Sequence, residues 1–316
     1  MSGKFVLVGE PMGLFIAEQQ GKLSEVEHFS SSVAGAEYNV AVALSRLGHV
    51  AQYCTKLGND PFGDKIFAGL EKNNIGTAFV MRVSDRLTGF MMKTSTLAGD
   101  PEIFYYRKNS AASSISPEDI DNLDLSGCEF LHITGITPAI SQSACAAVKR
   151  LIERGKENNL IISFDPNLRP QLWTSREEMV ETLNYLAKFA DIVLPGVKEG
   201  EILAGTGDER KIADFYHNMG VKSVIVKLGE KGAYYSEMNG ESGYAPAFTV
   251  NKIVDTVGAG DGFASGVISA IAEGFSLKEA AERGNIIGAI QITVKSDNEG
   301  LPTREELEAV IKKGSV

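Results

Sequence analysis

The stretch DTVGAGDGFASG, residues 255–266, places four glycines around two aspartates and then continues into small and apolar residues. A dinucleotide-binding fingerprint needs G-x-G-x-x-G or a closing alanine, but its last position falls on Phe263 or Ser265. A Walker A loop needs a lysine directly after the glycines, and none follows. The pattern therefore predicts a glycine turn that leads into a helix beginning near Asp261.

Two interpretations of this turn remain open from the residues alone. The backbone N–H groups of Gly258, Ala259 and Gly260 would lie at a helix N-terminus, where free amides and the helix dipole favour anions. The alternative is that Asp261 only caps the helix. The first interpretation predicts a phosphate-binding site, and the second predicts a structural turn.

Around this turn, short apolar runs alternate with helical patterns along the chain. The runs KFVLVGE, EFLHITGI and NLIISFDP are typical of buried strands, whereas NVAVALSRLG and SACAAVKRLIERG have helical periodicity. This alternation predicts an α/β fold with a mostly parallel sheet, helices on both faces and ligands at the carboxyl ends of the strands. With 316 residues, of which 43% are hydrophobic, the chain is long enough to bury such a core.

Two segments, about 11–34 and 88–110, depart from this pattern and alternate apolar with polar residues around Gly and Asp turns. They predict the strands of a small second sheet, a β lid over the crevice. Because the sequence contains no internal repeat and no low-complexity linker, we expect one domain, residues 1–316, that carries this lid.

Charge and cysteine usage narrow the partners. The net charge of −10 argues against nucleic acid and anionic membranes, because both require a basic surface. The cysteines at 54, 128 and 145 have no CxxC spacing, which fits a reducing compartment and gives neither a disulfide framework nor a thiolate metal site. The first apolar run is interrupted at residues 9–11, too early for a signal peptide or a membrane span. We therefore expect a cytoplasmic protein.

The segment VDTVGAGDGFASG resembles the C-terminal signature D-T-x-G-A-G-D of the ribokinase-like (PfkB) carbohydrate kinases. The resemblance implies a three-layer α/β/α sandwich. It also implies that Asp261 takes the proton of a sugar hydroxyl while the amides of Gly258, Ala259 and Gly260 hold the transferring phosphoryl group. This agrees with the physics of phosphoryl transfer, which depends mainly on positioning and charge stabilisation.

The segment VAGAEYNVAVALSRLG resembles the other signature of the family, a glycine turn before a helix. Members often have a pair of glycines in this turn. Here the first position is Ala34, so only Gly35 is expected to contact the sugar. Asn39, on the first helical turn, is the expected partner of a sugar hydroxyl, and the alternative is a polar residue that faces solvent.

Two arginines indicate the class of sugar. Arg107 ends the run IFYYR, and Arg169 follows the strand LIISFDPNLR at its carboxyl end. A guanidinium presents paired N–H donors that match a carboxylate, so two arginines in one crevice would select an acidic or phosphorylated sugar. The alternative is that both arginines form surface ion pairs.

Further segments, including FYYRKNSAAS, SFDPNLRPQLW and DNEGLPT, are similar to those of 2-keto-3-deoxygluconate kinases over most of the chain. This resemblance implies that Gly35, Tyr105, Arg107, Arg169 and Asp297 bind the keto acid. One departure concerns the substrate. After Thr-Gly some members carry a tyrosine that touches the sugar, whereas this chain has Met91.

The resemblance also implies ATP and Mg²⁺ as cofactors. The wider family has N-x-x-E at the magnesium; here Glu199 keeps the glutamate, but Gly196 replaces the asparagine, so the ion is expected to bind mainly through waters and ATP oxygens. The alternative for Glu199 is an exposed helix residue. Lys227 and Gly229 are expected near the phosphates or ribose, and Asn285 at the edge of the adenine, although a strand lysine and a helix asparagine also have common structural explanations. The requirement for a monovalent cation stays open.

The leading hypothesis is therefore ATP-dependent phosphorylation of 2-keto-3-deoxygluconate to its 6-phosphate. One alternative is a fructokinase or ribokinase that acts on a neutral sugar, and another is a non-catalytic sugar sensor on the same fold. Since an exposed small sheet favours pairing with a second copy, we also expect a homodimer through the lid.

Overall fold

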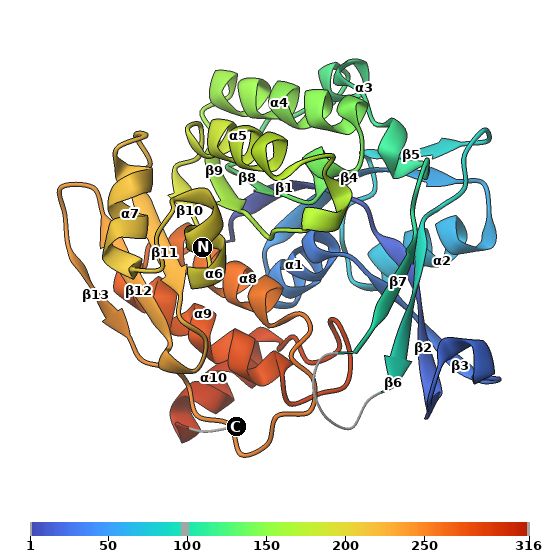
Figure 1. Ribbon diagram of the computed structural model, residues 1–316. Helices are drawn as coiled ribbons and strands as arrows, with labels where there is room; N and C mark the ends of the chain where they lie inside the picture. Colours follow the sequence, from blue (N-terminus) through green and yellow to red (C-terminus); the bar gives the residue numbers. More distant parts are fainter. Residues whose placement is uncertain (1, 96–100, 315–316) are drawn as a thin grey trace.

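A nine-stranded sheet runs through the computed structural model, which describes residues 2–95 and 101–314 (Figure 1). Neighbouring strands are parallel, except that β12 is antiparallel to both of its neighbours. In spatial order the strands are β13 (Ser242–Ala245), β12 (Ala233–Glu237), β11 (Ser223–Lys227), β10 (Ile192–Val193), β9 (Ile161–Asp165), β8 (Phe130–Thr134), β1 (Lys4–Val8), β4 (Val50–Gly58) and β5 (Val80–Val83).

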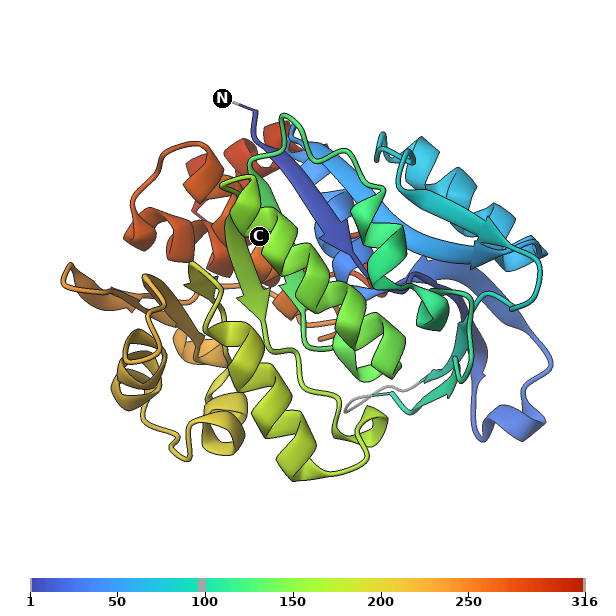
Figure 2. The same cartoon turned by 90° about the horizontal axis from the view of Figure 1, so that it is seen from above.

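The alternation of side chains along the strands creates two cores, one on each face of this sheet. In β1, Phe5 and Leu7 pack into one core and Val6 and Val8 into the other, because successive side chains of a strand point to opposite faces. The first core is covered by α1 (Ala36–Arg46), α2 (Pro61–Lys72), α8 (Ala259–Ala272), α9 (Leu277–Gln291) and α10 (Arg304–Lys313). The second is covered by α3 (Pro117–Asp121), α4 (Gln142–Glu157), α5 (Arg176–Ala187), α6 (Val197–Leu203) and α7 (Glu209–His217). The predicted three-layer α/β/α sandwich is confirmed (Figure 2).

A second sheet of four strands, called the small sheet below, lies at one side of this sandwich (Figure 1). Its order is β3 (Phe29–Ala34), β2 (Met12–Gln20), β6 (Phe90–Ser95) and β7 (Ile103–Tyr106). All four strands fall inside the two segments predicted from alternation, and residues 96–100 of the second segment lie outside the described residues. Because β2 and β6 are parallel and the outer pairs antiparallel, distant parts of the chain meet at the centre of this sheet.

The carboxyl ends of the parallel strands gather polar residues at one edge of the main sheet. Glu10 follows β1, while Asp165 ends β9 and Lys227 ends β11. Since the strands are parallel, these positions share an edge, which is where ligands bind in open α/β sheets. The fold thereby brings together charged residues that are far apart in the sequence.

Candidate active site

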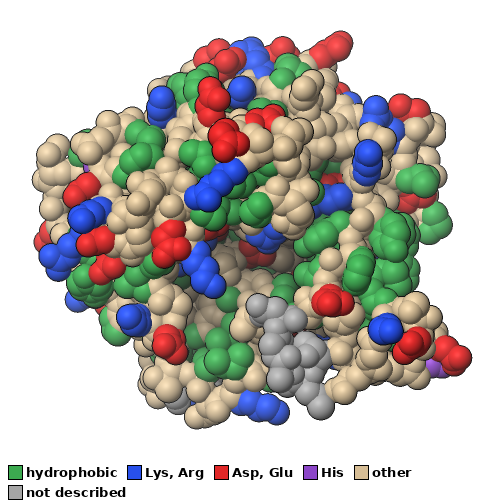
Figure 3. All heavy atoms as spheres, viewed as in Figure 1, with side chains coloured by type: hydrophobic (Ala, Val, Ile, Leu, Met, Phe, Trp, Pro, Cys, Tyr) green, Lys and Arg blue, Asp and Glu red, His purple; other side chains and the backbone are tan. Residues whose placement is uncertain are grey.

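The first cleft, with a volume of about 510 Å³, lies between this edge and the small sheet. Six carboxylates and three basic side chains line it, and Figure 3 shows the hollow with charged groups in its floor. Most of the predicted site residues line this cleft: Gly35, Asn39, Tyr105, Arg107, Arg169, Glu199, Lys227, Gly258, Gly260, Asp261 and Asp297. Met91, which stands where relatives can carry tyrosine, lines it as well.

The second cleft, of about 580 Å³, is mostly apolar and adjoins the first. The remaining predicted residues, Ala259, Gly229 and Asn285, line this second cleft. Lys227 and Gly260 line both clefts, so the glycine turn lies where the two meet.

The glycine turn differs from the prediction at the start of the helix. Helix α8 begins at Ala259 rather than near Asp261, with Gly258 as its N-cap in the left-handed conformation at φ 81°. A side chain at Gly258 would also collide with the carbonyl oxygen of Asp297. Gly260 is exposed, with open space where a Cβ would stand. Asp261 is therefore the third residue of the helix, and the interpretation that it only caps the helix is wrong.

The carboxylate of Asp261 is held by one neighbour and strongly affected by burial. Asn39 Nδ2 donates a hydrogen bond of 2.7 Å to Asp261 Oδ2. Burial raises the pKa of Asp261 to about 7; the Asn39 hydrogen bond works against this, whereas the charge of Asp165 adds to it. Such a carboxylate accepts and releases a proton near neutral pH, which is the property of a general base.

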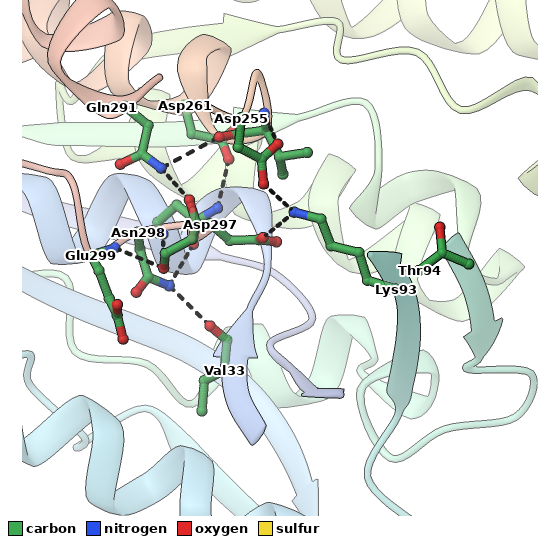
Figure 4. A network of polar contacts seen from close by, with 12 residues as sticks. Val33, Lys93, Thr94, Asp255, Asp261, Gln291, Asp297, Asn298 and Glu299 are labelled. Carbon is green, nitrogen blue, oxygen red and sulfur yellow. Dashed lines mark hydrogen bonds and ion pairs between the residues drawn. The ribbon is translucent and has the colours of Figure 1, made fainter. Parts of the chain in front are cut away.

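The side chain of Asn39 is itself held by a hydrogen bond from Asn298. Its Oδ1 accepts a hydrogen bond of 3.0 Å from Asn298 Nδ2, which also donates to the carbonyl of Val33 at 2.9 Å (Figure 4). The side chain of Asn39 is buried, so the solvent-facing alternative is wrong. The amide that was predicted to contact a sugar hydroxyl here orients Asp261.

Arg107 is already paired. Its Nε donates to Glu10 Oε2 at 2.7 Å, and its Nη2 lies 2.5 Å from the same oxygen. The Ser110 hydroxyl donates to the other oxygen of Glu10, and the centroid of the Tyr105 ring lies 5.7 Å from the Arg107 guanidinium carbon. Arg107 lines the first cleft, but its charge is balanced by a buried carboxylate that the sequence analysis did not identify.

Arg169 is different. Its Nη1 donates to the carbonyl of Leu168 at 2.9 Å, and no carboxylate within residues 2–95 and 101–314 forms an ion pair with it. The loop that carries it is anchored because Leu168 N donates to Glu199 Oε1 at 2.9 Å. The surface-ion-pair alternative therefore fails for both arginines, since one is buried with Glu10 and the other faces the cleft.

Residues 3–304 match the family model described as pfkB family carbohydrate kinase. The chain belongs to the pfkB family. Among curated relatives, a 2-dehydro-3-deoxygluconokinase of Bacillus subtilis is 43% identical over 97% of this chain and 94% of the relative. A probable fructokinase-2 of Arabidopsis thaliana is 32% identical over 98% of this chain and 96% of the relative.

Solved structures give the same family. A PfkB protein from Polaromonas sp. JS666 is 40% identical, with a TM-score of 0.89 over 98% of this chain and 100% of that chain. A putative ribokinase II from E. coli, solved in complex with ATP and Mg²⁺, is 28% identical, with a TM-score of 0.89 over 99% of this chain and 100% of that chain. The chain is a carbohydrate kinase of this family.

Within the pfkB frame, Lys227 bridges the two clefts as part of a charged group. Its Nζ lies 2.9 Å from each oxygen of Asp165 and 3.9 Å from Glu199 Oε2. Burial by itself lowers the pKa of Lys227, but the two carboxylates outweigh it and raise that pKa. Lys227 therefore carries its charge at the boundary between the clefts. Asp165 was not identified as a site residue, although its place at the end of an apolar strand was a usable signal.

The carboxylate of Glu199 accepts hydrogen bonds from backbone amides rather than facing solvent. Its Oε2 accepts a 2.6 Å hydrogen bond from Gly196 N, so the carboxylate closes the first turn of α6 while its other oxygen holds Leu168. Burial raises its pKa, and Lys227 lowers it. The exposed-helix alternative is wrong. In the described part of the chain, no three His, Cys, Asp or Glu side chains gather as a metal site.

Asn285 lies in the second cleft but also braces its wall. Its Nδ2 donates to the carbonyls of Ala245 and Pro246 at 3.1 and 2.9 Å. Gly229 lies in the same cleft with a positive φ of 63°. These contacts keep the segment after β13 in place beside the cleft.

Two further carboxylates of the first cleft are buried. Glu37 accepts hydrogen bonds from the hydroxyls of Thr134 at 2.5 Å and Thr137 at 2.9 Å, and burial raises its pKa. It was not identified from the sequence, because an acidic residue in a first helical turn is common. Asp297, which was predicted to contact substrate, is paired with Lys93 at 3.2 Å.

Proposed function

We propose that this pfkB kinase phosphorylates 2-keto-3-deoxygluconate (2-dehydro-3-deoxygluconate) to its 6-phosphate with ATP. The observation that carries the proposal is the pairing pattern of the first cleft. Arg107 is neutralised by Glu10, whereas Arg169 has no ion-pair partner among the described residues. A carboxylate on the sugar gives Arg169 that partner. The 43% identity to a 2-dehydro-3-deoxygluconokinase supports the same substrate.

The chemistry follows from Asp261 and the turn before it. The sugar hydroxyl gives its proton to Asp261 as its oxygen forms a bond to the γ-phosphorus of ATP. The bond from this phosphorus to the β,γ-bridging oxygen breaks, and ADP leaves with that electron pair. The amides of Gly258, Ala259 and Gly260 donate to the phosphoryl oxygens, where the helix end favours negative charge. Asn39 keeps the carboxylate of Asp261 directed into the cleft.

The second cleft fits the nucleotide. It is lined by apolar side chains such as Phe248, Ile253 and Ile292, which suit a flat base, and it opens onto Gly260 and Lys227, which suit phosphates. When bound with ATP, Mg²⁺ would supply neutralisation of the phosphate charge. Glu199 would meet this ion through water, because both of its oxygens already accept backbone N–H groups. Comparing turnover in potassium and tetramethylammonium buffers tests for an additional monovalent cation.

The first test is ADP release with Mg·ATP and 2-keto-3-deoxygluconate, fructose, ribose or no sugar. We expect a preference of at least tenfold in kcat/KM for the keto acid. A preference for fructose or ribose would keep Asp261 as the base but reject the acid-sugar assignment. Lack of turnover on every sugar would favour the sensor alternative.

We further propose that the 316-residue chain acts as one kinase domain with the small sheet as its lid, in the cytoplasm and as a homodimer. The outer side of the small sheet supports dimerisation, since Phe104 and Tyr106 on its edge strand β7 are 48% and 54% exposed. Figure 3 shows apolar side chains gathered on that side. A monomeric mass by light scattering at micromolar concentration would reject the dimer.

The proposed location in the cytoplasm is supported by the free cysteines, which fit a reducing compartment. No helix among the described residues is long and apolar enough to cross a membrane.

A further inference from the structure

Lys93 of the small sheet reaches into the main body between two carboxylates. Its Nζ lies 2.7 Å from Asp255 Oδ2 and 3.2 Å from Asp297 Oδ1 (Figure 4). The three side chains are almost inaccessible to solvent, with exposed fractions of 2% for Lys93, 8% for Asp255 and 5% for Asp297. The group therefore joins β6 to the segment before α8, which carries Asp255, and to the segment after α9, which carries Asp297.

Lys93 is a buried lysine on strand β6, and its charge must be compensated there. Lys93 lies two residues after Met91, so both side chains point to the inner face of the small sheet. Burying an ammonium group is costly unless carboxylates and hydrogen bonds compensate. Here the compensation comes entirely from outside the small sheet, which makes the position of β6 dependent on the main body.

The first partner of Lys93 shapes the start of the catalytic turn. Asp255 Oδ1 accepts a 3.1 Å hydrogen bond from the amide of Val257, the residue before Gly258. Its Oδ2 is the oxygen that binds Lys93. One carboxylate thus connects the lysine to the segment that presents the phosphate-binding amides.

The second partner leads to the catalytic base. The carbonyl oxygen of Asp297 packs against Gly258, and the next residue, Asn298, donates to Asn39 Oδ1. Asn39 in turn donates to Asp261. The contacts of Figure 4 therefore run from Lys93 to both the turn and the base.

We propose that Lys93 is a positioning residue for phosphoryl transfer, which couples the small sheet to the catalytic turn. Its charge also offsets two carboxylates that would otherwise repel the incoming phosphoryl group. This inference rests on the proposed kinase reaction. It makes the small sheet a support for the transition state in addition to a cover for the sugar.

The test compares K93M with a matched control, K295M. Lys295 Nζ donates to Ser95 Oγ at 3.1 Å, so it joins the same strand to the same late loop without a carboxylate and at the surface. We expect K93M to lower kcat about 30- to 100-fold because it leaves buried charges unpaired, with KM for both substrates within about threefold. An effect of simply removing a lysine that joins this strand to the late loop is excluded if K295M stays within about twofold of the wild-type kcat.

Restoring the charge separates positioning from folding. K93R should recover at least about a tenth of the wild-type kcat, because it keeps the cation. In K93A, added methylammonium should raise the rate, with no such effect on the wild type or K295M. Full activity of K93M, or a loss that neither K93R nor methylammonium relieves, would overturn the inference.

A second measurement needs neither turnover nor the correct sugar. Amide hydrogen exchange over residues 255–261 should be at least about tenfold faster in K93M than in the wild type and unchanged in K295M. Should K93M not fold, K93M/D255N, which removes one carboxylate with the cation, carries the same test when it is compared with D255N, because Asp255 itself contacts this turn. Unchanged exchange would reject the coupling, whereas failure of the proposed function would appear only in the sugar panel.

Discussion

The two clefts that meet at Gly260 are lined by different kinds of side chain. Six carboxylates and three basic side chains line the first, whereas Lys227 and Glu230 are the charged residues that line the second within the described chain. In the first cleft most charges are paired before any ligand arrives: Glu10 with Arg107, Asp165 with Lys227 and Asp297 with Lys93. The second cleft offers apolar walls and backbone instead.

This difference between the clefts suggests two ways of selecting a ligand, by shape in the second cleft and by charge in the first. An apolar wall discriminates by shape and gives modest differences in affinity, whereas an unpaired buried charge discriminates strongly between charged and neutral ligands. The paired groups of the first cleft hold its geometry, and in the proposed function Arg169 is the group that recognises the anionic sugar. Substitutions on the first side should therefore have larger effects than those on the second.

The largest effect is expected at Asp261, which lines the first cleft directly after Gly260, where the two clefts meet. D261N should lower kcat by about 10³-fold or more, because it removes the base but keeps the size of the side chain. It should also raise the free energy of unfolding by about 1–2 kcal/mol, because burial disfavours the charged carboxylate. Steady-state kinetics and chemical denaturation measure both; a kcat within tenfold of wild type would contradict the base assignment.

The next effect separates the two arginines. R169A should lower kcat/KM for 2-keto-3-deoxygluconate by about 100-fold and change kcat/KM for fructose by less than about threefold, because only the acid uses the guanidinium. R107A, in contrast to R169A, should reduce the thermal unfolding temperature, because it leaves the carboxylate of Glu10 buried without its partner. Equal losses on acid and neutral sugars for R169A would contradict the proposed role.

The pH dependence should follow the base. Because the pKa of Asp261 is raised to about 7, kcat/KM should fall about tenfold per pH unit below this value as the carboxylate becomes protonated. Stability has the opposite sign: the folded state binds this proton more tightly than the unfolded state, so the contribution of Asp261 to stability decreases as pH rises from about 4 to 7. The residual activity of D261N should lack the limb near pH 7. A flat profile for the wild type between pH 5 and 8 would exclude this titration.

The smallest effect is expected in the second cleft. N285A should raise KM for ATP about two- to fivefold with kcat nearly unchanged, because it removes two hydrogen bonds that hold the cleft wall. N184A is a matched control, since Asn184 also donates its amide to a backbone carbonyl, that of Leu203, at 3.0 Å. A larger loss in N285A than in R169A would reverse the ranking of the clefts.

The sequence was sufficient for features set by local patterns. Alternating strand and helix segments predicted the layers, and the glycines before Asp261 predicted a turn that leads into a helix, which is α8. The start of α8 was predicted two residues late, since Gly258 takes the left-handed cap conformation and lets the helix begin at Ala259. Periodicity alone does not reveal such a cap.

The ion pairs of the first cleft were beyond sequence analysis. Glu10 and Arg107 are separated by 97 residues, and Lys93 and Asp297 by 204. A pairing over such distances leaves no local pattern. In the alternating segment around Lys93, the sequence also gives no sign that this polar side chain points into the protein rather than into solvent.

Because Lys227 and Gly260 belong to the walls of both clefts, the sites proposed for the sugar and for ATP have two wall residues in common. A ligand that changes the position or the charge environment of these two residues alters the affinity of the neighbouring cleft. Thermodynamic linkage makes this influence reciprocal: the factor by which ATP changes sugar affinity equals the factor by which sugar changes ATP affinity. Any coupling through the common wall would therefore have the same size whichever cleft is filled first.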